Sequence, residues 1–244
     1  KDWSQALSKA GVPRAGVNFP YPQCFKKAAS EHGIPEALLL AVARGESDFN
    51  PRAVYHANAV GVMQILWPQT ANHLGIRYRS QLYDPCTNID AGARYMKELL
   101  KTYQGKVHLA LAAYNYGPGR IRVNASQIPK GADWYSRYIL RHYDYVTGSN
   151  TSRRAASSSP AQPSTASSST AIAYVQERKL ELIRIDRPYR AQAFIGLLKK
   201  RIPELKLDWF KLPNHHYKVI ARYQSAAQLK KIKTQLDQAG VIIH

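Results

Sequence analysis

A glutamate closes an apolar, helix-length segment in the first quarter of the chain. Residues 34–43 are dominated by leucine, alanine and valine, and Glu46 follows them in the run Ala-Arg-Gly-Glu-Ser-Asp-Phe-Asn-Pro. Pro35 suits the first position of a helix, so the pattern predicts a buried helix over 35–45. Apolar neighbours desolvate a carboxyl, which raises its pKa and keeps it protonated. Glu46 is therefore the candidate general acid.

Two simpler interpretations compete with this one. Asp48 is the nearest second carboxyl, but two positions along a helix or turn it points away from the direction of Glu46, so we expect a turn or capping role. An isolated Glu-Ser pair is also commonly a surface feature at a helix end. The assignment of Glu46 therefore depends on the motifs that follow it.

The first later motif, Gly-Val-Met-Gln-Ile over residues 61–65, carries groups suited to a sugar. Gly61 permits close approach of the backbone to a ligand, and Gln64 supplies amide donors and acceptors for hydroxyl and N-acetyl groups. Met63 is either an adaptable apolar wall or part of the core.

Two further motifs add phenols and amides. Tyr114 and Asn115 end a predicted helix, where the phenol can reach Glu46 or substrate and the amide can bind an acetamido group. Tyr138 is either an aromatic that projects back towards the acid or a core residue. Ser47 either orients the acid and holds sugar or bonds to nearby backbone.

The elements that position these residues are mainly helical. Apolar residues recur at three- and four-residue spacing, and glycines at 33, 75, 105 and 117 stand where helices would stop. Asn88 or Thr87 is the expected cap of the helix that begins near residue 89. Strand-like alternation is scarce in this half. The expected helices cover residues 21–32, 35–45, 68–74, 89–103, 107–114 and 134–146.

The order of these motifs resembles the lysozyme-like soluble lytic transglycosylase domain of bacterial cell-wall enzymes, over about residues 21–146. The resemblance implies an α-helical lysozyme-like fold. It also implies non-hydrolytic cleavage of the β-1,4 bond between N-acetylmuramic acid and N-acetylglucosamine, which leaves a 1,6-anhydro ring. Glu46 would be the acid, and the implied substrate contacts are Ser47, Gly61, Val62, Met63, Gln64, Tyr114, Asn115 and Tyr138.

The chemistry of that reaction agrees with a single acid. A retaining glycosidase uses two carboxyl groups about 5 Å apart, whereas attack by the sugar's own 6-hydroxyl needs one residue that acts first as acid and then as base. One departure from the family stands before Tyr138, where Ala132-Asp-Trp-Tyr replaces the usual acid-Thr-Arg pattern. Asp133 is a doubtful substitute, so no second acid is assigned.

The composition limits the classes of partner that the protein could bind and the redox compartment in which it could function. The chain has 244 residues, 45% of them hydrophobic, and 35 basic against 16 acidic side chains give a formal charge of +19. This charge favours a polyanionic partner such as nucleic acid, anionic lipid or bacterial wall, and does not choose among them. Cys24 and Cys86 are compatible with one disulfide in an oxidising compartment or with two buried thiols.

No segment has the roughly 20 apolar residues needed to span a bilayer, and no signal peptide opens the chain. We expect an exported protein of the periplasm or cell envelope whose signal has been removed. Peripheral or lipid-anchored membrane association stays compatible with the abrupt start at Lys1.

The domain plan is α+β. The first domain is expected over residues 1–146, and residues 147–171 form a Ser-, Ala- and Pro-rich linker that cannot build a core. Residues 172–244 then alternate between strand-like and helical patterns in the order β-α-β-β-α-β, a small ferredoxin-like layout. Its expected strands cover 179–185, 207–212, 217–223 and 241–243, and its helices 191–201 and 225–239.

By layout, the last domain resembles the sporulation-related repeat (SPOR) domain, which binds glycan strands stripped of stem peptides. An RNA-recognition domain has the same element order, but the strand over 217–223 lacks its aromatic signature, so we expect no nucleic-acid partner. The lysines near residues 199 and 230 are equally consistent with solvated helix faces.

The histidines, including the adjacent His215 and His216, do not converge, and no phosphate-binding loop is present, so we expect no metal and no cofactor. The predicted function is a peptidoglycan lytic transglycosylase with Glu46 as general acid and base. A lysozyme-type hydrolase and a non-catalytic wall-binding or secretion-assembly protein are the alternatives.

Overall fold

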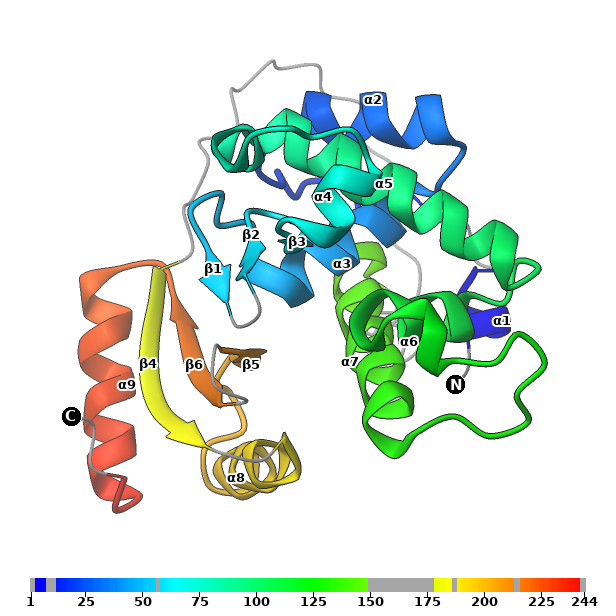
Figure 1. Cartoon of the computed structure of the whole chain (residues 1–244). Coiled ribbons are helices and arrows are strands. Elements are labelled where there is room, and N and C mark those ends of the chain that lie inside the picture. Colours follow the sequence, from blue (N-terminus) through cyan, green and yellow to red (C-terminus); the bar gives the residue numbers. More distant parts are fainter. Residues whose placement is uncertain are drawn as a thin grey trace, which may run out of the picture. The chain divides into compact units, whose positions relative to one another are not determined.

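The computed structural model describes residues 3–7, 12–55, 58–148, 178–185, 188–212 and 216–241 (Figure 1). The chain divides into two compact units, Lys1–Pro160 and Ala161–His244. The division falls inside the predicted linker, of which residues 149–171 lie outside the described residues.

The first unit is built mainly from helices, as predicted (Figure 1). Each of the six expected helices is present, with ends that differ from the expected ones by at most four residues. A short helix near the start of the chain was not predicted. The helices are α1 (Trp3–Leu7), α2 (Pro22–His32), α3 (Glu36–Ser47), α4 (Gln69–His73), α5 (Pro85–Thr102), α6 (Val107–Tyr116) and α7 (Lys130–Thr147), with short 3₁₀ helices at Arg79–Tyr83 and Pro118–Arg120.

A three-stranded antiparallel sheet connects α3 to α4 and was missed by the sequence analysis. Its strands β1 (Val54–Tyr55), β2 (Ala59–Val60) and β3 (Ile65–Leu66) run in the order β1-β2-β3. Each strand has only two residues, too few for an alternating pattern to be recognised. The tight turn of residues 61–64, which carries the first motif, joins β2 to β3.

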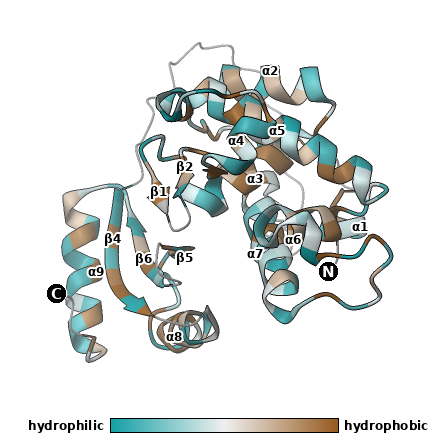
Figure 2. Cartoon of the chain, viewed as in Figure 1, coloured by the Kyte–Doolittle hydropathy of each residue, from teal (hydrophilic) through white to brown (hydrophobic). Residues whose placement is uncertain are grey.

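The core of the first unit forms around α3, in which every residue from Ala37 to Ser47 is buried. Helix α3 packs against α7, and α6 also packs against α7. Helix α2 packs against α5. Figure 2 shows hydrophobic colouring along α3 and mixed colouring along α5 and α7. A helix surrounded by protein can be apolar all round, whereas α5 and α7 keep polar faces.

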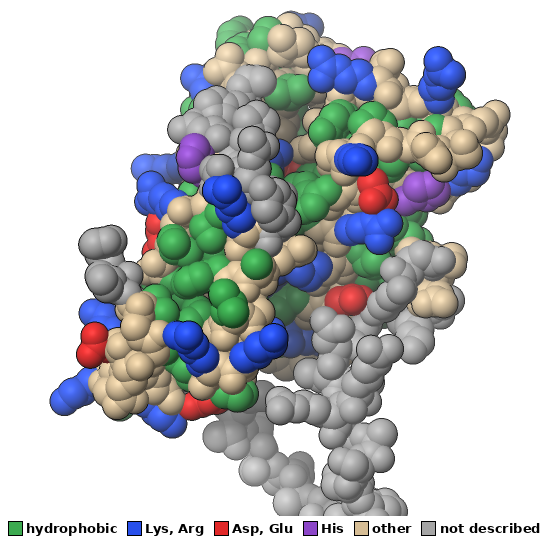
Figure 3. Space-filling view, turned by 90° about the horizontal axis from the view of Figure 1, so that it is seen from below, with side chains coloured by type: hydrophobic (Ala, Val, Ile, Leu, Met, Phe, Trp, Pro, Cys, Tyr) green, Lys and Arg blue, Asp and Glu red, His purple; other side chains and the backbone are tan. Residues whose placement is uncertain are grey.

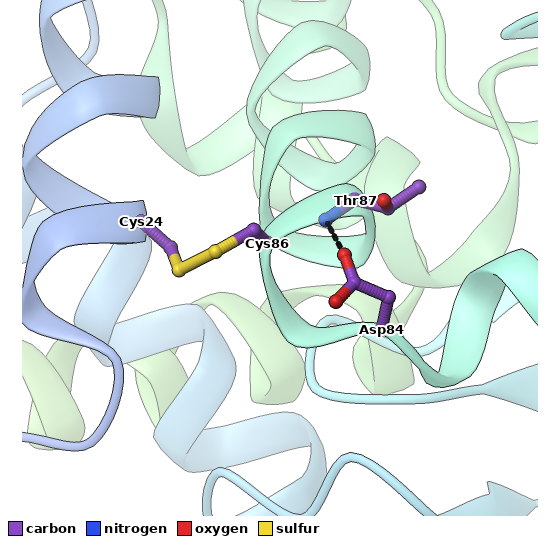
Figure 4. Close-up of a disulfide and its surroundings, with 4 residues drawn as sticks. All are labelled: Cys24, Asp84, Cys86 and Thr87. Atoms are coloured by element: carbon purple, nitrogen blue, oxygen red, sulfur yellow. Dashed lines mark hydrogen bonds between the residues drawn. A yellow bond between two sulfur atoms is a disulfide. The ribbon is translucent and has the colours of Figure 1, made fainter.

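Two helix starts differ from the prediction. Pro35 is the N-cap of α3 and not its first residue. Helix α5 begins at Pro85, and the side chain of Asp84 caps it by accepting a hydrogen bond from the Thr87 amide at 2.8 Å (Figure 4). Asn88 is therefore not the cap, because the helix starts a full turn earlier than its apolar pattern.

Cys24 of α2 and Cys86 of α5 form a disulfide, which links the two helices across 62 positions of sequence (Figure 4). Of the two open interpretations of the cysteines, the structure has the bridged one. The covalent link joins α2 to α5, the helix that supports the turn of residues 61–64.

The second unit contains an antiparallel sheet and two helices. Strand β6 (Tyr217–Tyr223) lies between β4 (Arg178–Ile185) and β5 (Leu207–Lys211), and the helices are α8 (Pro188–Arg201) and α9 (Ala226–Gln238). Ser225 caps α9 as predicted. The predicted last strand begins at Val241, which is not in a strand, and residues 242–243 lie outside the described residues. Among the described residues of the whole chain, no helix is both long and apolar enough to cross a bilayer.

Candidate active site

Glu46 lies in the last turn of α3 with 8% of its surface exposed. Asp48 follows as the C-cap, where its left-handed backbone, with φ of 52°, ends the helix. The predicted capping role of Asp48 is therefore confirmed. The helix delivers the Glu46 carboxyl to a largely buried position, where a polar group needs protein partners or ligand.

Tyr135 is the partner of Glu46. Its hydroxyl, carried by α7, donates a hydrogen bond to Oε1 of Glu46 from a fully buried position. Burial, followed by the charge of Glu46 and this hydrogen bond, raises the pKa of Tyr135 well above the usual 10.0. The phenol therefore stays protonated and remains a donor to the carboxyl throughout the physiological range.

Tyr114 lies close enough to respond to the same carboxyl. Burial first, and then the charge of Glu46, raise the pKa of Tyr114 well above 10.0. Its hydroxyl donates to the Met63 carbonyl at 2.8 Å, so α6 holds the first motif in place. Asn115, the next residue, is half-buried in the last turn of α6.

Tyr138 reaches the backbone beside the acid. Its hydroxyl donates to the Gly45 carbonyl at 2.8 Å, and its ring stacks on Trp134 with centroids 5.1 Å apart. Tyr135, three residues earlier on the same face of α7, donates the hydrogen bond to the carboxyl. The sequence analysis missed Tyr135, although two tyrosines at this spacing were a signal that either one reaches α3.

The turn of residues 61–64 faces the same helix end. Ser47 donates its hydroxyl to the Val62 carbonyl at 2.7 Å, which is the backbone role considered for it. The Gln64 amide nitrogen donates to the carbonyls of Ala53 and Gly61 at 3.2 and 2.9 Å. Its Oε1 is buried and has no hydrogen-bond partner among the residues that the structure describes. A buried acceptor of this kind is costly unless a ligand or water donates to it.

The side chain of Asn88, in α5, holds the turn of residues 61–64 in place through hydrogen bonds to the backbone. Its Oδ1 accepts from the Met63 amide at 2.7 Å, and its Nδ2 donates to the carbonyls of Val60 and Leu82, each at 2.9 Å. The side chain is fully buried. Both the oxygen and the nitrogen of the amide are thus hydrogen-bonded. No local sequence pattern signals this role, because the three partners are backbone atoms.

Two predicted contact residues face the protein interior. A Cβ added to Gly61, which has φ of +80°, would lie 2.3 Å from Nδ2 of Asn88, so the close approach at Gly61 is to the protein's own amide. The Met63 side chain is fully buried against Gly92 of α5. The core interpretation of Met63 is the one that the structure has.

One group of described residues has spacing compatible with a metal ion. Ligand atoms of Glu31, His32 and Asp90 lie within 4.8 Å of one another. His32 contacts Asp90 at 2.6 Å, and Asp90 also pairs with Arg94 at 3.0 Å. Because ion pairing already accounts for these contacts, we assign no metal to the group.

Comparison with known proteins identifies a family for part of the first unit. Residues 23–136 match the transglycosylase SLT domain family. The membrane-bound lytic murein transglycosylase C of Klebsiella pneumoniae is 34% identical over 141 residues, which are 48% of this chain and 39% of the relative. The protein of the same name from Haemophilus influenzae is 36% identical over 116 residues, which are 41% of this chain and 32% of the relative.

Among solved structures, the 70-kDa soluble lytic transglycosylase of Escherichia coli matches with a TM-score of 0.47 and 32% identity, over 52% of this chain and 24% of that protein. The chain spans less than two fifths of the length of the two curated relatives. Glu46, the turn of residues 61–64, Tyr114 and Tyr135 all lie within the matched range. The chain thus contains a transglycosylase SLT domain over residues 23–136.

Proposed function

We propose that this chain is a peptidoglycan lytic transglycosylase in which Glu46 is the catalytic residue. The observation that carries the proposal is the buried Glu46 carboxyl, bonded by Tyr135, inside a domain that matches the transglycosylase SLT family. The relatives' names, lytic murein transglycosylase, support murein as the substrate. A lysozyme-like fold for this unit is part of the same proposal.

Glu46 acts twice in the proposed reaction. As an acid it gives its proton to the oxygen that joins N-acetylmuramic acid to N-acetylglucosamine, and the bond from that oxygen to C1 of muramic acid breaks. The 6-hydroxyl oxygen of the same muramic acid then bonds to C1, and its proton returns to the Glu46 carboxylate. The products are a free 4-hydroxyl on the glucosamine and a 1,6-anhydro ring, without consumption of water.

The surroundings of Glu46 suit both steps. Burial disfavours the charged form of a carboxyl and so favours the proton donor, while a donated hydrogen bond favours the carboxylate. Tyr135 supplies that bond from a phenol that itself stays neutral. The carboxylate formed after the first step is therefore stabilised until it accepts the second proton.

Gln64 is the proposed contact for an N-acetyl group. Its amide nitrogen is held by two backbone carbonyls, which leaves the buried Oε1 to accept from a substrate N–H. Ser47, Gly61, Val62, Met63, Tyr114, Asn115 and Tyr138 complete the proposed site, some through substrate contact and the buried ones through the shape of its wall.

The second unit is proposed to be a SPOR-like, ferredoxin-like module that binds glycan. The strand order β4-β6-β5 and the helices α8 and α9 support this layout. Residues 147–171 would then be a flexible tether that raises the local concentration of the catalytic unit on the wall.

We place the protein in the cell envelope, with the periplasm as the proposed compartment. The disulfide between Cys24 and Cys86 supports an oxidising environment. The word membrane-bound in the relatives' names supports proximity to a membrane.

Digestion of peptidoglycan by the protein and by Glu46→Gln, followed by mass spectrometry of the released muropeptides, tests the function. The substitution keeps the size of the side chain and its capacity to bond to Tyr135, and removes the transferable proton. We expect anhydro-muropeptides from the native protein and a loss of about 10²–10⁴-fold in the variant, since that is the usual contribution of a general acid-base group.

Thermal unfolding of both proteins is the control for folding. Muropeptides with reducing ends would instead identify a hydrolase. Absence of products from both proteins, with glycan binding intact, would contradict catalysis and favour the wall-binding alternative.

A further inference from the structure

The second unit has an apolar pocket between β4 and α8. Its volume is about 580 Å³, and its apolar lining includes Ile183, Ile185, Phe194 and Leu197. We refer to it as the β4–α8 pocket. Strand β4 contributes Ile183 and Ile185, and helix α8 contributes Phe194 and Leu197. Together these apolar residues form a surface that neither element would have alone.

Two of these side chains are exposed. Ile183 has 39% of its surface accessible, and Leu197 has 60%. A single exposed aliphatic residue is ordinary on a protein surface, but two that border one apolar pocket form a contiguous patch. Such a patch is a site where contact with an apolar phase is favourable.

Positive charge borders the pocket. Arg184, Arg190 and His216 contribute to its lining, and none of the lining residues that the structure describes is acidic. The nearby Glu181 pairs with Arg184 at 2.5 Å. The last turn of α8, which follows Leu197, carries Lys199 and Lys200. Figure 3 shows apolar side chains bordered by Lys and Arg on this unit, towards the lower left of the view.

We propose that the β4–α8 pocket docks the second unit on an anionic lipid surface. Aliphatic side chains flanked by basic ones are the combination that enters the boundary between headgroups and acyl chains, with the cations at the phosphates. A glycan site would instead present aromatic faces, whereas Phe194, the one aromatic residue among the described lining residues, is half-buried. The balance of residues 172–244, fifteen basic against six acidic, favours the same partner.

Vesicle sedimentation with the full chain tests the proposal. We expect binding to vesicles of phosphatidylglycerol and phosphatidylcholine, little binding to phosphatidylcholine alone, and weaker binding at high salt. The double variant Ile183→Thr with Leu197→Ser should bind the anionic vesicles at least tenfold more weakly. Lys199→Glu with Lys200→Glu should weaken binding by a similar factor.

The matched control is Lys230→Glu with Lys231→Glu, which makes the same change of charge at exposed positions of α9. It should bind the anionic vesicles within about twofold of the native protein, since these charges lie away from the pocket. Equal loss in the α9 control would overturn the pocket as the docking site, since net charge alone would then explain binding. If the native protein did not bind the anionic vesicles, the proposal of a lipid partner would be wrong.

Measurements of peptidoglycan binding and of oligomeric state distinguish lipid from two other occupants of the pocket, glycan and a second copy of the chain. If Ile183→Thr with Leu197→Ser abolished binding to peptidoglycan sacs but not to vesicles, the pocket would hold glycan. If it converted a dimer into a monomer, the pocket would hold a second copy. None of these measurements requires Glu46, so failure of the proposed reaction and failure of lipid docking are separate results.

Discussion

At the scale of single residues, the phenols around Glu46 give the protein a definite response to alkaline pH. Burial and the charge of Glu46 raise the pKa of Tyr135 and Tyr114 in the folded state. In the unfolded chain these phenols ionise near pH 10. Below about pH 10 both states are protonated, and above it the unfolded state loses protons first.

The free energy of unfolding should therefore fall as pH rises above about 10, and Tyr135→Phe should make that fall less steep. Urea unfolding of both proteins between about pH 8 and 11 measures the two slopes. Tyr78→Phe, at a side chain with 68% exposure, is the control. Equal slopes for the native protein and Tyr135→Phe would contradict the environment described for this phenol.

Gly61 is the second residue whose substitution should have a clear effect, here on the free energy of unfolding. An alanine there would combine a backbone with φ of +80° with contacts of 2.3 Å to Asn88 and 2.4 Å to the Leu82 carbonyl. We expect Gly61→Ala to lower the free energy of unfolding by at least about 2 kcal/mol. Chemical denaturation measures the change. Gly119→Ala, where the added carbon meets nothing within 4 Å, should be close to neutral, and similar losses in both would contradict the prediction.

At the scale of elements, the disulfide adds a covalent link between two helices that also pack against each other. Cys24 and Cys86 close a loop of 62 positions between α2 and α5. The chain-entropy relation gives about 4 kcal/mol for a loop of that length. Cys24→Ser with Cys86→Ser should lower the free energy of unfolding by roughly this amount.

Guanidinium unfolding of the double variant, beside native protein treated with a reductant, makes the measurement. The two should agree, since both lack the same bridge. A double variant that retained native stability would show that the unfolded chain gains little freedom when the bridge is removed.

The same helices show why element positions were predictable and some element ends were not. Buried faces with three- and four-residue spacing predicted α2, α3, α5, α6 and α7. The starts of α5 and α7 extend four residues further, through Pro85 and Lys130, because capping and proline effects set a helix end without adding apolar residues.

At the scale of the whole molecule, charge is the property with a measurable consequence. The chain carries a formal charge of +19, and peptidoglycan carries stem-peptide carboxylates. Attraction between such surfaces is screened by salt. Raising sodium chloride from about 0.05 M to about 0.5 M should weaken binding to peptidoglycan sacs several-fold.

Co-sedimentation with the sacs measures this dependence, and chitin, an uncharged glycan, is the control. Binding to chitin should change little with salt. Salt-independent binding to the sacs would show that contacts with sugar, and not charge, dominate the interaction.

The sequence by itself determined six of the seven α-helices described in the first unit, most of the second unit's elements and the position of Glu46 at the end of α3. These features follow from local patterns: apolar spacing, a proline near a helix start, and short motifs in a fixed order. Only the tertiary structure decided that Tyr135 bonds to Glu46 while Tyr138 bonds to the Gly45 carbonyl. Both tyrosines share one face of α7, so their spacing is equally compatible with either contact. The choice depends on how α7 is rotated and shifted against α3, and that packing joins residues 89 positions apart, beyond the reach of any local pattern.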